Sequence, residues 1–139
     1  MIVVDTNVVT YELIPSSYPA ESTLADAVFL CDPEWCAPAF WRSEFCNVLV
    51  THVRARGMAA ADAAACWEQA QSLLAWRDHA LDGPAVIELA VRSGCSAYDC
   101  EFVVLARTLG ISLVTADKRI LKTFPDIAVS LSDFAKGRR

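Results

Sequence analysis

Residues 2–7 read Ile-Val-Val-Asp-Thr-Asn, and residues 113–117 read Leu-Val-Thr-Ala-Asp. Each stretch is a short apolar, largely β-branched run that stops at a polar turn, which is typical of a buried parallel strand leading into a helix. An aspartate, Asp5 or Asp117, stands at the carboxyl end of each predicted strand. Ligands of open α/β sheets bind beyond the carboxyl ends of the strands, near the point where the strand order reverses. Two parallel neighbouring strands of this kind would direct both carboxylates into one crevice.

The rest of the chain alternates between predicted strands and predicted helices. Strands are expected at about residues 2–4, 35–38, 76–81, 111–115 and 127–129. Helices are expected at about residues 6–13, 20–30, 40–56, 59–74, 83–93, 96–109 and 118–123. This alternation predicts an α/β fold with a mainly parallel sheet. No repeat, low-complexity tract or Gly/Ser linker interrupts it, so residues 1–139 are expected to form a single domain.

Composition and charge exclude several classes of protein. The net charge of −5 argues against a protein that coats nucleic acid through a broad basic surface, but it allows an enzyme that contacts one short RNA segment. No apolar run approaches the roughly 18 residues that span a bilayer, and the N-terminus lacks the basic region of a signal peptide, so we expect a cytoplasmic protein without a membrane anchor. The six cysteines include no C-x-x-C pair, so neither a structural zinc site nor a disulfide framework is expected.

Two further acids lie near the starts of predicted helices. Asp99 stands three residues after Ser96, in the first turn of its helix. Glu44 lies in the first turns of the helix at 40–56, on a stripe shared with Trp41 that turns it towards the interior. Both helices follow turns that leave the same region of the sheet, so their amino ends could face the crevice.

Together, the four acids predict a cation site. Carboxylates that converge within about 4–6 Å repel one another by several kcal/mol at an effective dielectric constant near 20. A fold tolerates this repulsion where protons or a cation neutralise the cluster. An all-oxygen site suits Mg²⁺ or Mn²⁺, and such a site can activate water for attack on phosphorus while it neutralises a phosphodiester.

Each acid also has a purely structural explanation. Asp5 and Asp117 could be helix N-caps, because aspartate is among the best capping residues. Ser96 and Asp99 could form a capping box, and Glu44 could be a solvated helical glutamate. For any one of these acids taken alone the structural explanation is favoured, and it is their joint occurrence that favours a site.

Other chemistries need residues that the sequence lacks. A haloacid-dehalogenase-like phosphatase would need a second aspartate where Asn7 stands, and a phosphate receiver domain would need a lysine where Thr115 stands. A metal-independent ribonuclease of the paired-histidine type would need His52 and His79 in one site, although they lie in separate segments. The chain contains neither a P-loop nor a G-x-S-x-G motif.

Four segments resemble the motifs of PIN-domain proteins. They are Val-Val-Asp-Thr-Asn at 3–7, Trp-Arg-Ser-Glu-Phe-x-Asn-Val-Leu at 41–49, Ser-Ala-Tyr-Asp-Cys-Glu-Phe-Val-Val-Leu-Ala at 96–106, and Leu-Val-Thr-Ala-Asp-x-x-Ile-Leu at 113–121. The resemblance covers essentially the whole chain, in the order and spacing of the family. Size and the absence of another domain make the chain similar to the VapC toxins of VapBC toxin–antitoxin pairs.

The resemblance implies a three-layer αβα sandwich and a nuclease that hydrolyses RNA to a 5′-phosphate and a 3′-hydroxyl, without a covalent enzyme intermediate. It implies one or two Mg²⁺ or Mn²⁺ ions on Asp5, Glu44, Asp99 and Asp117. It implies ligand- or water-orienting roles for Thr6, Asn7 and Thr115. It also implies a toxin homodimer that a VapB-type antitoxin inhibits in a hetero-oligomer. The alternatives are a PIN fold kept as a non-catalytic binding partner and a PIN nuclease with an RNA-processing role outside toxin–antitoxin systems.

Three basic residues are candidate contacts to the RNA backbone, with a simple surface role as the alternative. Arg42 precedes the acid of its helix by two positions, and Lys118 and Arg119 follow the last strand's acid at the expected rim of the crevice. Trp41 and Trp76 could stack on bases, but packing in the core or at a dimer interface is favoured for both.

Overall fold

The structure, a computed structural model, describes residues 1–74 and 78–138. Its strands form one five-stranded sheet in the order β3-β2-β1-β4-β5, and every pairing between neighbours is parallel. The strands are β1 (Ile2–Val4), β2 (Trp35–Pro38), β3 (Asp78–His79), β4 (Leu113–Val114) and β5 (Ala128–Val129). The predicted α/β fold with a parallel sheet is therefore confirmed.

The order of the strands changes direction at β1. From β1 the chain builds β2 and then β3 on one side, and it later returns to form β4 on the other side of β1. Val3 pairs with Leu113 and Val4 pairs with Val114, so β1 and β4 are parallel neighbours that end at the same level. The expectation that the strands before Asp5 and Asp117 are parallel neighbours is confirmed, and their carboxyl ends lie at the switch point of the sheet.

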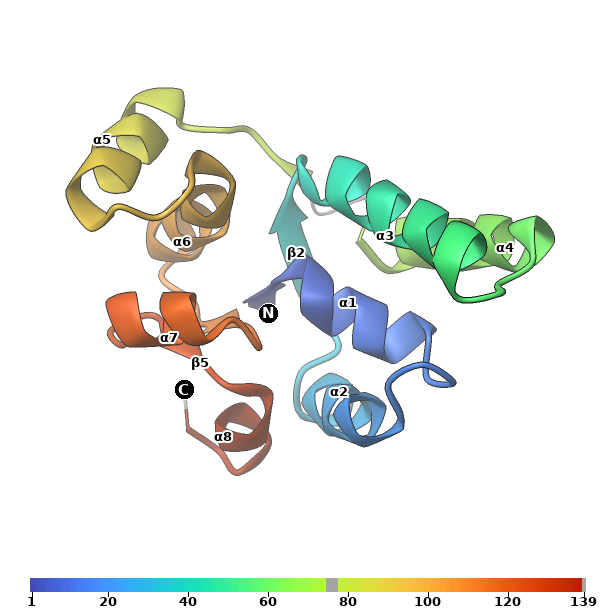
Figure 1. Cartoon of the computed structure of the whole chain (residues 1–139). Coiled ribbons are helices and arrows are strands. Elements are labelled where there is room, and N and C mark those ends of the chain that lie inside the picture. The colour runs from blue at the N-terminus through green and yellow to red at the C-terminus, as the bar shows by residue number, and fades with distance from the viewer. Residues whose placement is uncertain (75–77, 139) are drawn as a thin grey trace.

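Helices cover both faces of the sheet, which gives three layers. Figure 1 shows α5 and α6 on one side of the central strands and α1 to α4 on the other. α6 packs on β1, β2 and β4, while α4 packs on β2 and α8 packs on α2. The helices are α1 (Thr6–Leu13), α2 (Pro19–Cys31), α3 (Trp41–Ala55), α4 (Ala60–Leu74), α5 (Gly83–Ser93), α6 (Ala97–Leu109), α7 (Lys118–Thr123) and α8 (Leu131–Ala135).

The core lies between the sheet and its helices. β1, β2 and β4 are buried along their whole length, as the continuous apolar runs of their sequences predict. α6 is buried over the unbroken run 102–106, because it lies on the sheet and is itself covered by α5. α3 instead buries one stripe, with Phe45, Leu49 and His52 at helical spacing. The buried side chains of α3 and α6 hold these two helices in place, and Glu44 and Asp99 lie on them.

β4 and β5 are shorter than the strands expected at 111–115 and 127–129, and the structure differs from the sequence-based expectation more clearly at two further places. α8 was not expected; Ser130 caps it by accepting a hydrogen bond from the backbone N–H of Asp133, and Leu131 and Phe134 are buried. The strand expected at 76–81 comprises Asp78–His79, and its expected start, with Trp76, lies outside the described residues. All six cysteines are free thiols. No helix in the described ranges is both long and apolar enough to cross a membrane.

Candidate active site

Asp5 leaves the end of β1 and is held by side chains from two elements. It occupies the N-cap position of α1 with an extended backbone, yet its side chain makes no capping hydrogen bond. Its Oδ2 instead accepts hydrogen bonds from Thr115 Oγ1 at 2.5 Å and from Asn7 Nδ2 at 2.8 Å. Only 8% of Asp5 is exposed. The side chains of Thr115 and Asn7 therefore orient the Asp5 carboxylate at the junction of β1 and β4.

Thr115 and Asn7 join that junction into one polar network. Thr115 is fully buried, and its hydroxyl, besides donating to Asp5, accepts from the backbone N–H of Asp117 at 2.9 Å. Asn7 Oδ1 accepts from the backbone N–H of Ala116 at 3.1 Å. The network thus fixes both the Asp5 carboxylate and the turn from β4 into α7, which begins after Asp117.

Asp117 does cap a helix, as its structural explanation proposed. Its Oδ1 accepts hydrogen bonds from the backbone N–H groups of Arg119 at 2.7 Å and Ile120 at 3.0 Å. Capping and ligation are compatible, because a carboxylate has a second oxygen and several lone pairs. The cap fixes the orientation of Asp117 beside the network around Asp5.

Glu44 and Asp99 approach the same region from the starts of α3 and α6. Glu44 is half-buried, and its Oε2 accepts a hydrogen bond of 2.6 Å from Thr6 Oγ1, which anchors α3 to the first residue of α1. Asp99 lies in the first turn of α6, where its backbone N–H donates to the Oγ of the N-cap Ser96 at 3.0 Å. The predicted Ser96 cap exists, and it sets the orientation of the turn that carries Asp99.

The carboxylates act on one another electrostatically. Burial raises the pKa of Asp5 above its ordinary 3.8, and the charge of Asp117 adds to the rise against the hydrogen bonds of Thr115 and Asn7. Burial also raises the pKa of Glu44 above 4.5, opposed by the Thr6 hydrogen bond and reinforced by the charges of Asp5, Asp99 and Glu101. Within the described ranges, none of Asp5, Glu44, Asp99 and Asp117 forms an ion pair. The four predicted acids are thus linked in pairs, since the charge of Asp117 acts on Asp5 and the charges of Asp5 and Asp99 act on Glu44.

A sequence profile of the PIN domain matches residues 2–126. The chain belongs to the PIN domain family. PIN domains are generally nucleases, and PIN nucleases generally use divalent metal ions. The structure of this PIN domain is similar to the crystal structure of PAE2754 from Pyrobaculum aerophilum, with a TM-score of 0.74 and 19% sequence identity over 97% of this chain and 93% of that chain. No curated protein matches the sequence closely.

The donor set of this PIN domain fits a hard divalent cation in its chemistry. All four candidate ligands are carboxylates, the groups that Mg²⁺ and Mn²⁺ prefer. In the part of the chain that is described, no three His, Cys, Asp or Glu side chains lie close enough to hold an ion as they stand. The acids therefore act on one another electrostatically without forming a ready-made cluster of three ligands in these ranges.

The three predicted basic contacts have different surroundings. The Arg42 guanidinium lies 5.3 Å from the Trp41 ring centroid and donates to Gln71 on α4 at 3.1 Å, so α3 and α4 hold it. Arg119 donates to the carbonyl of Gly94, which ties α7 to the turn before α6. Lys118 is exposed and has no hydrogen-bond or ion-pair partner among residues 1–74 and 78–138. Of the three, Lys118 is the one that is exposed and makes no such contact within these ranges.

Sequence-based reasoning missed two features near the acids. Glu101 on α6, which the sequence analysis did not single out, has a pKa raised by burial, and its charge helps to raise the pKa of Glu44. The rings of Phe40 and Tyr98 stack between the starts of α3 and α6. The sequence signal for this stack was Tyr98, an aromatic residue directly before Asp99. The expectation that Trp41 packs in the core is confirmed, since it is fully buried.

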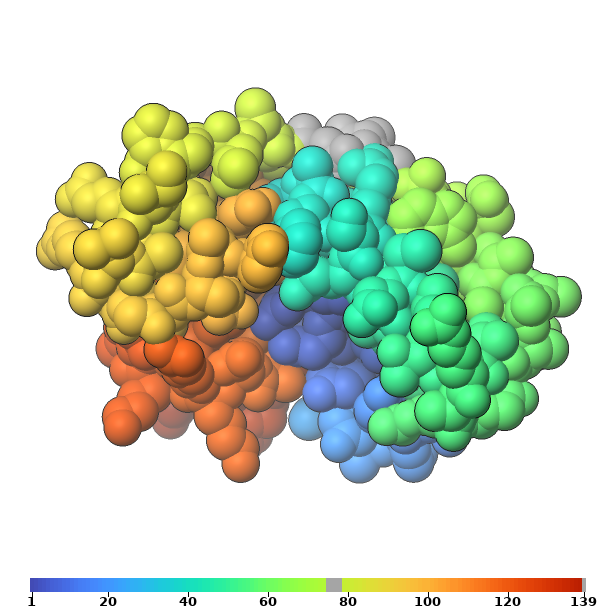
Figure 2. Space-filling model, turned by 45° about the horizontal axis from the view of Figure 1, so that its top comes forward, coloured from blue at the N-terminus to red at the C-terminus, as the bar shows by residue number. Residues whose placement is uncertain are grey.

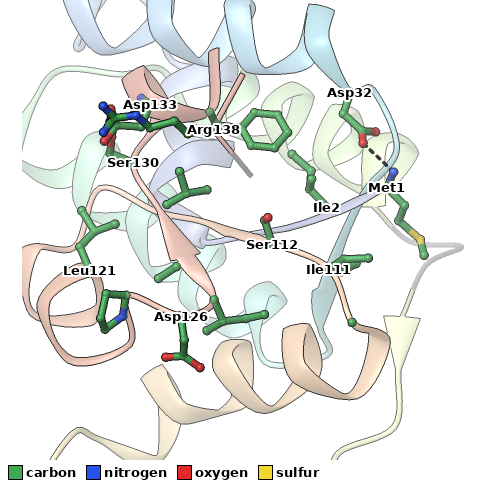
Figure 3. Close-up of a pocket in the computed structure, with 16 residues that line it drawn as sticks. Met1, Ile2, Asp32, Ile111, Ser112, Leu121, Asp126, Ser130, Asp133 and Arg138 are labelled. Atoms are coloured by element: carbon green, nitrogen blue, oxygen red, sulfur yellow. Dashed lines mark hydrogen bonds and ion pairs between the residues drawn. The ribbon is translucent and has the colours of Figure 1, made fainter. Parts of the chain in front are cut away.

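A separate hollow lies elsewhere in the molecule. It measures about 960 Å³ and is found at the amino ends of the strands, where Ile2, Ile111 and Ser112 line it (Figure 3). Asp32, Asp126 and Asp133 are its acids, and none of the four predicted ligands borders it. Its position opposite the switch point separates it from the candidate active site.

Proposed function

We propose that the chain is a Mg²⁺- or Mn²⁺-dependent endoribonuclease that hydrolyses RNA phosphodiester bonds. The observation that carries the proposal is the group of acids without cationic partners at the carboxyl ends of β1 and β4. Burial and mutual repulsion raise the pKa of Asp5 and of Glu44, which is the environment that a bound cation relieves. Membership of a family that generally comprises nucleases supports the reaction class.

Each residue has a role that follows from its contacts. Asp5, Glu44, Asp99 and Asp117 would be the metal ligands, with Asp5 oriented by Thr115 and Asn7 and with Glu44 oriented by Thr6. A divalent cation bound there would neutralise the acids and activate the water that attacks phosphorus. Lys118, exposed directly after Asp117, would bind a phosphate of the RNA backbone. No side chain needs to attack the phosphorus, so no covalent enzyme intermediate is expected.

We further propose that this nuclease is the toxin of a VapBC-type toxin–antitoxin pair. The support is the resemblance of its four acidic motifs to those of VapC proteins. A VapB-type antitoxin, a toxin homodimer, a toxin–antitoxin hetero-oligomer and a cytoplasmic location would follow from that role. A short partner gene beside the reading frame would distinguish a toxin from a PIN nuclease with an RNA-processing role.

A second candidate function is a PIN fold retained as a non-catalytic binding partner. All four acids are present, and Thr115, Asn7 and Thr6 hold two of them by hydrogen bonds. A protein that only binds has no need to preserve a group whose charges repel one another. The retained acids therefore favour the nuclease.

The test is RNA cleavage by the purified chain in Mg²⁺ or Mn²⁺ and in EDTA. We expect cleavage with the metal ion, none in EDTA, and a loss of about a hundredfold or more in Asp99→Asn, because changing a residue that only supports a metal ligand already costs about 10- to 100-fold. Asp126→Asn is the matched control, since Asp126 is exposed and forms only a surface ion pair with Arg107. Cleavage in EDTA, or at the parent rate by Asp99→Asn, would refute the proposed mechanism.

A further inference from the structure

Phe40 and Tyr98 form a stacked pair of rings beside the candidate active site. Their centroids lie 4.5 Å apart and their planes differ by 14°, which is close to parallel. Tyr98 is nevertheless 56% exposed, and it is the one aromatic among the exposed large hydrophobic residues of the described chain. Because one face of the Tyr98 ring lies on Phe40, the exposed area is that of the opposite face and the edge. The pair is thus a fixed ring with an open face.

The stack lies between the two helices that present acids. Phe40 immediately precedes α3, one helical turn before Glu44, and Tyr98 immediately precedes Asp99 in the first turn of α6. Figure 2 shows the start of α6, in orange, against the start of α3, in cyan, with the dark blue beginning of the chain in the hollow below them. The charge of Asp99 acts on Glu44, which agrees with this proximity. The open ring therefore borders the crevice.

Electrostatics alone gives this chain little affinity for RNA. With a net charge of −5 and acids in the crevice, phosphate contacts are few, and Lys118 is the open one of the three predicted basic contacts. Proteins that hold single strands supplement phosphate contacts with aromatic rings on which bases stack. A ring already ordered by a second ring loses little side-chain entropy when a base binds.

We propose that the Phe40–Tyr98 stack is a platform on which one nucleobase of the RNA stacks, next to the scissile phosphate. The inference rests on the proposed nuclease function and adds to it a residue, Tyr98, that positions the substrate. A base inside a duplex has both faces covered by its neighbours, so the base that lies on Tyr98 has to be unstacked. Any base has a flat face, so the platform accepts every base.

The test compares binding of intact and abasic RNA. The probe is a fluorescent single strand of about ten nucleotides, either intact or abasic at its central positions, because single-strand sites span about 4–16 nucleotides. Binding is measured by anisotropy with Mg²⁺ in an Asp117→Asn background, which keeps the RNA uncut. We expect intact RNA to bind roughly 5- to 100-fold more tightly than abasic RNA, from the usual contribution of one stacked base.

The variants assign that preference to the ring. Tyr98→Ala should remove the preference for intact RNA, and Tyr98→Trp should keep it. Ile87→Ala, a change at another exposed apolar residue, on α5, should leave the preference unaltered. In the cutting enzyme, Tyr98→Ala should raise KM with little change in kcat.

The two proposals can fail separately. Equal binding of intact and abasic RNA, or an unchanged preference in Tyr98→Ala, overturns the platform even when the parent cuts RNA. Base-dependent binding through Tyr98 by a parent that never cuts RNA overturns the nuclease and not the platform. A Tyr98→Ala variant that changes only the association state of the protein overturns the platform in favour of a contact with a second copy.

Discussion

Thr115 is the residue on which the local arrangement of the acids depends most. Its single hydroxyl donates to Asp5 Oδ2 and accepts from the backbone N–H of Asp117, so it touches the end of both strands. Thr115→Val keeps the shape but leaves two buried polar groups short of a partner. We expect a loss of about 1–3 kcal/mol in the free energy of unfolding, measured by urea denaturation, from the usual cost of such groups.

The control for this change is Thr51→Val, because the Thr51 hydroxyl is exposed and bonds only the carbonyl of Asn47 one turn earlier in α3. It should alter stability by less than about 0.5 kcal/mol, as surface changes usually do. Equal stability of Thr115→Val and the parent would mean that the network around Asp5 contributes nothing.

Single residues also mark the limit of what the sequence predicts. Strand ends and motif resemblance were sufficient to predict the positions of the acids, of Thr115 and of Asn7. The backbone largely determines where a short side chain lies. Arg42 and Arg119 did not follow: their long side chains reach Gln71 and Gly94, partners distant in the sequence. Such contacts depend on tertiary packing, which local patterns do not encode.

At the scale of elements, hydrophobic periodicity was sufficient for the sheet and most helices. α3 and α6 begin and end within about one residue of their predicted limits, because Gly110 and the residues before Gly57 end them in the usual way. α8 escaped prediction, since the five residues of Leu131–Ala135 are too short to display a helical period. Ser130 followed by Asp133 was the only local signal.

The N-terminus of α6 carries a prediction of its own. Ser96→Ala removes the hydroxyl that accepts from the Asp99 N–H and should cost about 0.5–2 kcal/mol of stability, the range for lost caps. It should also weaken Mn²⁺ binding, because the first turn that presents Asp99 loses its cap. Ser130→Ala removes the matching cap of α8 and should reduce stability alone. The measurements are thermal unfolding and metal titration of both variants. If Ser96→Ala bound Mn²⁺ as tightly as the parent does, the cap would have no part in metal binding.

At the scale of the whole molecule, the acids link stability to pH and to metal ions. Asp5 and Glu44 have pKa values raised by folding, so the folded chain binds more protons than the unfolded chain between the ordinary and the raised values. Stability without metal should therefore fall as pH rises from 3.8 through the raised values. Metal binding competes with those protons, so the stabilisation by Mg²⁺ should grow over the same range.

Thermal unfolding with and without Mg²⁺ at several pH values tests this linkage. A concentration ten times the dissociation constant should add about 1.4 kcal/mol, or roughly 4 °C in Tm, once the acids are ionised. The increase should be absent in Asp5→Asn. A Mg²⁺ effect of the same size at every pH would contradict the assignment of the effect to these carboxylates.

The central claim is that Asp5, Glu44, Asp99 and Asp117 act as one site for a divalent cation. The most direct measurement is equilibrium binding of Mn²⁺ near pH 7, followed by electron paramagnetic resonance, for the parent, for each single Asn or Gln variant of the four acids, and for Asp126→Asn. We expect binding by the parent and by Asp126→Asn, and clear weakening in each of the other variants. Absence of binding by the parent, or affinities that the four substitutions leave unchanged, would contradict the claim.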